Sequence, residues 1–149
     1  MALLASTGLR NALLDTGSLK SSLADGFIKI YQSAAGDVPT TADQAITASH
    51  TLLLTIYGDG ISAGLNLGTA SAGQIGKDAG ESWSGTVTTT GTATFFRFVA
   101  PGDTGASSST EKRLQGRVGV SGAELNISSL SLTAGNTQAI NFISINMPG

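Results

Sequence analysis

The sequence predicts a mainly β fold, a jelly-roll-like antiparallel β-sandwich that follows a short N-terminal helical segment. Seven to nine short stretches either alternate apolar and polar residues or run continuously apolar, and turn residues separate them. The chain also contains 20 glycines and abundant Ser and Thr, a composition typical of short strands joined by tight turns. For 149 residues we expect a helical arm over residues 1–26 and one β-sandwich domain over residues 27–149.

The N-terminal segment is predicted to be helical over residues 5–24. Ser6 or Thr7 can cap its start, and Gly17 can end the first helix in the left-handed conformation. Helices this short are marginal alone in water, so their leucines must be buried on another surface. Two alternatives remain open, because the segment can lie on its own domain or dock as an arm on a neighbouring subunit.

The stretch 91–99 is predicted to be the central core strand. Its alternation should turn Phe96 and Phe98 inward and Arg97 outward. Three of the five phenylalanines occur here, and the only tryptophan, Trp83, lies just upstream. A chain this poor in aromatic residues should centre its core on this strand, although an aromatic binding face is the alternative.

Further strands are predicted on both sides of this core strand. In chain order they fall within residues 27–31, 51–57, 61–67, 113–120, 125–132 and 138–147. The stretch 51–57 is apolar on both faces, which suits a strand between two covered surfaces. The loop 101–110 is rich in Gly, Ser and Thr, so we expect it to lie exposed.

The composition argues against several classes of function. Without cysteine the chain can form neither a disulfide framework nor a thiolate metal site. With 12% charged residues, a net charge of −2 and no basic cluster, we expect no nucleic-acid partner. No apolar run approaches the ~20 residues of a membrane span, so we expect no membrane partner. A surface so poor in charge suits a protein that is packed against partner proteins.

The motifs that superficially resemble catalytic or ligand sites lack the required spacing. Residues 80–85 read Gly-Glu-Ser-Trp-Ser-Gly and do not match the nucleophile pattern G-x-S-x-G. Residues 58–64 space their glycines one residue too far apart for a dinucleotide loop, and His50 is the only histidine. The aspartates are scattered and never form a calcium loop. We therefore expect no enzyme, no cofactor and no metal site.

Two blocks of the sequence resemble small virion proteins of tailed double-stranded-DNA phages. The first runs over residues 4–20, LASTGLRNALLDTGSLK, and continues with FIKIY at 27–31. The second comprises SWSG at 82–85, GTATFFRFVA at 91–100 and GDTG at 102–105. The chain most resembles the capsid cement, or decoration, proteins. That resemblance implies a β-rich, often jelly-roll protein on the outside of the head, where dimers or trimers clamp neighbouring major capsid subunits.

The resemblance therefore implies a structural protein on the outer capsid surface, with the major capsid protein and other copies of itself as partners. The candidate interface consists of apolar residues from both terminal segments: Leu3, Leu4, Leu9, Leu13, Leu14, Ile145 and Met147. One alternative is a different virion component, such as a tail or head-completion protein. Another is a carbohydrate-binding β-sandwich, which should expose Tyr31, Tyr57 or Trp83 beside Asp or Asn.

Overall fold

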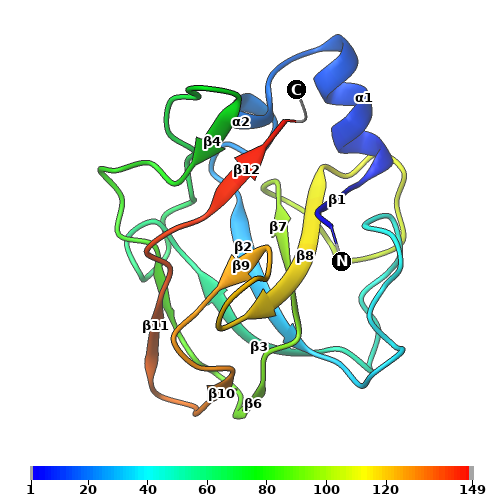
Figure 1. The fold of residues 1–149 in the computed structure, drawn as a ribbon. Helices are drawn as coiled ribbons and strands as arrows, with labels where there is room; N and C mark the ends of the chain where they lie inside the picture. The colour runs from blue at the N-terminus through cyan, green and yellow to red at the C-terminus, as the bar shows by residue number, and fades with distance from the viewer. Residues whose placement is uncertain (1, 148–149) are drawn as a thin grey trace.

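The computed structural model describes residues 2–147 and contains mainly antiparallel β-strands with two short helices (Figure 1). The elements are β1 (Leu4–Ala5), α1 (Thr7–Asp15), α2 (Leu19–Ser22), β2 (Phe27–Gln32), β3 (Thr51–Ile56), β4 (Gln74–Gly76), β5 (Ser84–Thr86), β6 (Gly91–Thr92), β7 (Phe95–Val99), β8 (Arg113–Gly119), β9 (Leu125–Asn126), β10 (Ser131–Leu132), β11 (Thr137–Ala139) and β12 (Ser144–Asn146). The predicted mainly β class is confirmed.

The sheets comprise one large sheet and three small ones. The large sheet has six strands, in the order β1-β8-β7-β2-β3 with β9 paired to β8. Three two-stranded sheets pair β6 with β10, β5 with β11, and β4 with β12. All pairs are antiparallel except β8 with β9. This topology fits the predicted class, whereas the jelly-roll arrangement itself is not confirmed.

The core is centred on β7, as predicted. Phe96 and Phe98 have 0% exposed surface, and they lie opposite Ile30 and Ile28 of β2. Trp83 packs edge-on against Phe98, with ring centroids 6.0 Å apart. Cross-strand aromatic and β-branched pairs of this kind contribute packing beyond simple burial. The aromatic residues therefore do form the centre of the core.

The prediction that Arg97 points into solvent is wrong. Its side chain does point to the face of the sheet opposite Phe96. Loop residues 33–50 cover that face, however, and Arg97 is only 1% exposed. Its Nε donates to Gln115 Oε1 at 2.7 Å, and Gln115 Nε2 donates to the Pro39 carbonyl oxygen at 2.6 Å. Burial, followed by the neighbouring Arg113 cation, lowers the pKa of Arg97 to about 10.

The expectation that loop 101–110 lies exposed is wrong at Asp103. The Asp103 carboxylate accepts from Arg113 Nε at 2.5 Å and from Arg113 Nη2 at 3.2 Å. These side chains are 2% and 0% exposed, so the ion pair is buried. Arg113 also donates to the carbonyl oxygens of Ala42 and Ala106, at 3.2 and 2.7 Å. One guanidinium thus fastens two loops onto the sheet.

A two-residue strand that was not predicted, β1, precedes the helices of the N-terminal segment. β1 pairs with β8, and only then does Ser6 cap α1 by accepting from the Leu9 N–H at 3.1 Å. The Ser6 hydroxyl also accepts from the Arg113 N–H at 2.9 Å and donates to the Glu111 carbonyl oxygen at 2.7 Å. The predicted Ser6 cap is confirmed, and it joins the helix to the sheet.

The prediction of a left-handed Gly17 is also wrong. Gly17 is not among the residues with positive φ, and Thr16, which caps the end of α1, has right-handed backbone angles. The Gly17 N–H donates to the Ala12 carbonyl oxygen at 2.9 Å. The next helix, α2, starts almost at once with a capping box on Ser18. The chain therefore needs no reversal at Gly17.

Contacts hold α1 against the body of its own chain. Asp43 accepts from the Thr7 N–H at 2.8 Å and from the Thr7 hydroxyl at 2.6 Å. Burial acts to raise the pKa of Asp43, but these hydrogen bonds outweigh it and the pKa lies below its ordinary value of 3.8. Leu9 has 0% exposed surface and belongs to the core. Contact of this segment with a neighbouring subunit stays a prediction.

Candidate functional site

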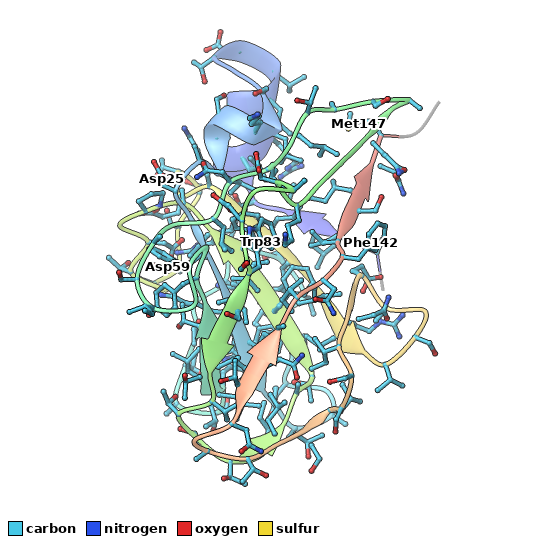
Figure 2. The ribbon with its side chains drawn as sticks, turned by 90° about the vertical axis from the view of Figure 1, so that its left-hand side faces the viewer. Asp25, Asp59, Trp83, Phe142 and Met147 are labelled. Carbon is cyan, nitrogen blue, oxygen red and sulfur yellow. The ribbon has the colours of Figure 1, made fainter. Side chains whose placement is uncertain are left out.

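An apolar groove of about 660 Å³ lies where the two terminal segments of the chain meet. Its walls come from β1, α1 and α2 on one side and from β4 and β12 on the other. Figure 1 shows β12 ending at the same end of the molecule as the helices, and Figure 2 places Met147 on the same side as Phe142, away from Asp25 and Asp59. Segments almost the whole chain length apart thus build a single surface feature.

The groove brings together five of the seven predicted interface residues: Leu3, Leu9, Leu13, Ile145 and Met147. Leu9 and Ile145 are buried and form its floor, whereas Leu13 is 37% exposed and Met147 is 71% exposed at its rim. The side chain of Leu9 therefore serves the core of this chain and is not free to contact a partner.

The other two predicted interface residues do not line the groove. Leu4 lies opposite Gln115 in the β1–β8 ladder, and alternation turns it to the face away from Leu3 and Ala5. Leu14 is 87% exposed on α1 and does not line the groove. Treating the N-terminal leucines as one apolar arm could not show which of them line the groove. The two-residue strand β1, in particular, has no recognisable pattern.

Several groove residues carry no sequence signal for a site. Ile75 is an isolated apolar residue within a Gly-rich stretch, and Ala5 is small. Leu19 and Leu114 follow ordinary core spacing. Only the pairing of β12 with β4 and of β1 with β8 sets them around one groove.

The chemistry of the groove is hydrophobic. Among the described residues that line it, Lys20 of α2 is the only charged one. Removing apolar surface from water contributes roughly 25 cal/mol per Å², so a partner gains mainly from burial here. Among the large apolar side chains that line it, Leu13 and Met147 are the exposed ones.

The remaining polar motifs serve the fold. His50 Nδ1 accepts from the Thr47 N–H at 3.0 Å, and its Nε2 lies 2.7 Å from the Asp37 carbonyl oxygen. The Asp59 carboxylate accepts three backbone N–H bonds within the turn 58–64, and these bonds lower its pKa to about 2. Within residues 2–147 no three His, Asp or Glu side chains converge to hold a metal ion.

The aromatic side chains that a carbohydrate site would need are mostly internal. Trp83 is 1% exposed, and its Nε1 donates to Glu81 Oε2 at 2.6 Å. Tyr31 is 5% exposed and stacks on Phe95, with centroids 5.1 Å apart, and burial raises its pKa. Tyr57 is half-buried. Trp83 and Tyr31 therefore offer no exposed ring face for a sugar.

No protein-family model, curated protein or solved structure matches this chain. Neither helix within residues 2–147 has the length and hydrophobicity that crossing a membrane requires.

Proposed function

We propose that this protein is a structural cement protein of a phage head, which attaches to major capsid subunits through the apolar groove. The observation that carries the proposal is the groove itself, where residues from both termini leave apolar side chains partly exposed. The sequence resemblance supplies the class of partner. A cement protein needs a rigid body and an adhesive surface, and it needs no catalytic group.

The energetics of such attachment suit a groove of this kind. Burying a few side chains such as Leu13 and Met147 contributes several kcal/mol per copy before ordering costs, at roughly 25 cal/mol per Å². That is modest for one contact. A cement protein is present in many copies over the head, so the same modest contact repeated at each site resists separation of neighbouring subunits.

The test measures attachment of the purified protein to intact heads that lack it. Met147→Glu and Leu13→Glu place a carboxylate at the rim of the groove, where an unpaired charge is costly to bury. We expect each to weaken binding about tenfold or more, which corresponds to ~1.4 kcal/mol. Co-sedimentation with the heads, quantified by gel densitometry, gives the bound fraction.

The matched control is Ile61→Glu. Ile61 is 78% exposed, and its N–H donates to the Asp59 carboxylate. Figure 2 shows Asp59 on the side of the molecule away from Met147. The Ile61→Glu protein should bind heads like the unchanged protein. Heads that do not bind the protein at all, or that bind the Met147→Glu protein normally, would contradict the proposal. A low copy number in the virion would instead favour a tail or head-completion component.

A further inference from the structure

Loop 33–50, which covers the Arg97 face of the sheet, is fastened mainly in its middle part. Three of its carbonyl oxygens, those of residues 39, 41 and 42, accept hydrogen bonds from side chains of β7 and β8. The Ile46 N–H donates to the Gly105 carbonyl oxygen at 2.7 Å. The turn 34–38 lacks such bonds, and among residues 2–147 its only hydrogen bond to a residue outside 33–38 comes from His50.

His50 connects this turn with the other end of the loop. Its Nε2 lies 2.7 Å from the Asp37 carbonyl oxygen, and its Nδ1 accepts from the Thr47 N–H at 3.0 Å. The imidazole also packs edge-on against Phe95, with ring centroids 5.6 Å apart. A single half-buried side chain thus joins turn 34–38, turn 47–50 and β7.

These partners determine the protonation state of the ring. A backbone N–H can only donate, so the Nδ1 that faces the Thr47 N–H carries no proton. A carbonyl oxygen can only accept, so the Nε2 that faces Asp37 carries one, and His50 is neutral in this arrangement. An imidazolium has a proton on both nitrogens. The Thr47 hydroxyl, 3.3 Å from Nδ1, could accept the second proton, but the Thr47 N–H would lose its acceptor.

The charged side chains around His50 are mainly cations. On the face of β2, β7 and β8 that contains Phe95, strand alternation places these charged or titratable residues: Lys29, Tyr31, Arg97, Arg113 and Arg117. The loops contribute Asp103, which is paired with Arg113, and Asp37, which lines the same shallow hollow as His50. The three strands thus offer no carboxylate that could pair with a protonated His50.

We infer that His50 is a pH-sensitive latch, which ties the two ends of loop 33–50 together when it is neutral and releases Thr47 when it is protonated. His50 is the only histidine of the chain, and histidine is the side chain that ordinarily changes charge between about pH 5 and 8. The neutral form fits the closed loop, so the latch is complete at the upper end of this range and is lost as the pH falls. The middle of the loop keeps its bonds, so only turns 34–38 and 47–50 should open.

The experiment follows the unchanged protein by NMR at about pH 7.5 and about pH 5.5. At the higher pH, the ring nitrogen shifts should show the Nε2–H form of His50. Lowering the pH should reduce the protection of the Thr47 amide against hydrogen exchange about tenfold, relative to an unstructured chain at the same pH. The Ile46 amide is the internal control, because it bonds to Gly105 and should keep its protection.

The matched variants are His50→Gln and His50→Phe. Glutamine keeps a donor and an acceptor but does not change charge in this range, so the Thr47 amide should show no pH-dependent loss of protection. Phenylalanine keeps a ring against Phe95 without nitrogen atoms, so the Thr47 amide should be poorly protected at both pH values. If neither variant folds, the ring nitrogen shifts and the Thr47 and Ile46 amides of the unchanged protein still decide the question.

Four results would overturn the latch: a proton on Nδ1 at about pH 7.5, unchanged Thr47 protection at about pH 5.5, an equal loss of protection at Ile46, or the same pH response in His50→Gln. The latch needs no partner, so its test is independent of attachment to phage heads. A working latch in a protein that does not bind heads would reject only the cement proposal.

Discussion

Replacing Asp103 with alanine should lower the free energy of unfolding by roughly 3–5 kcal/mol. Asp103 is the carboxylate partner of Arg113, and the two side chains are 2% and 0% exposed. Without it, the Arg113 cation stays buried with only the carbonyl oxygens of Ala42 and Ala106 as partners. Removing one member of a buried pair is costly because it leaves an uncompensated charge.

A second buried cation adds to this cost. Arg97 is 1% exposed, and its Nη1 has no hydrogen-bond partner among the described residues. Repulsion from Arg113 already contributes to its lowered pKa. Loss of the Asp103 charge would leave both guanidinium groups unneutralised on one face of the sheet. For a chain of this length the predicted loss corresponds to a fall in Tm of about 6–20 °C.

Thermal unfolding followed by circular dichroism at pH 7 measures the effect. The control is Arg117→Ala, which removes an exposed ion pair. Arg117 Nε lies 3.7 Å from Glu124 Oε2, and the Arg117 side chain is 49% exposed. That change should cost about 0–1 kcal/mol. The double variant Asp103→Ala/Arg113→Met lacks the unpaired Arg113 cation, so it should recover part of the lost free energy of unfolding. A Tm for Asp103→Ala as high as that of Arg117→Ala would refute the buried-pair argument.

The other predictions concern the core, α1 and the Asp59 turn. Phe98→Ala should cost about 3–5 kcal/mol in denaturant unfolding, because the ring has 0% exposed surface. Leu9→Ala should cost about 2–5 kcal/mol, whereas Leu14→Ala, at a side chain 87% exposed, should change stability by less than ~0.5 kcal/mol. NMR titration should give the Asp59 carboxyl a pKa of about 2, below its ordinary 3.8. The turn should therefore be favoured above about pH 4 and lose that contribution as the pH falls through 2, and a midpoint near 3.8 would contradict it.

Local sequence patterns predicted a strand correctly where the apolar side chains of one of its faces were enough to identify it. The run 95–99 forms β7 with Phe96 and Phe98 in the core, and residues 27–31 and 51–56 form β2 and β3. These predictions depend on the two-residue alternation of side chains, which is fixed by the backbone. The Ser6 cap is equally local, because it joins residues three apart.

Tertiary packing decided the features that alternation leaves undefined. Alternation puts Arg97 on the face opposite Phe96, but it cannot tell whether that face meets water or loop 33–50. β1 has two residues and exists because β8 offers it an edge. A pattern of apolar and polar residues must extend over several residues to be recognised in a sequence. A strand of two residues such as β1, in contrast, needs only a neighbouring strand with which to form hydrogen bonds.

The candidate site shows the same division. The sequence identified apolar terminal segments, and five of the seven chosen residues line the groove. It could not show that Leu9 belongs to the floor and Leu14 to an unrelated surface, because this depends on which face of α1 meets the sheet. Nor could it place Asn146 and Ala5 around the same groove. Residues so far apart in sequence meet only through the pairing of β1 with β8 and of β12 with β4, and those long-range contacts have no local signal.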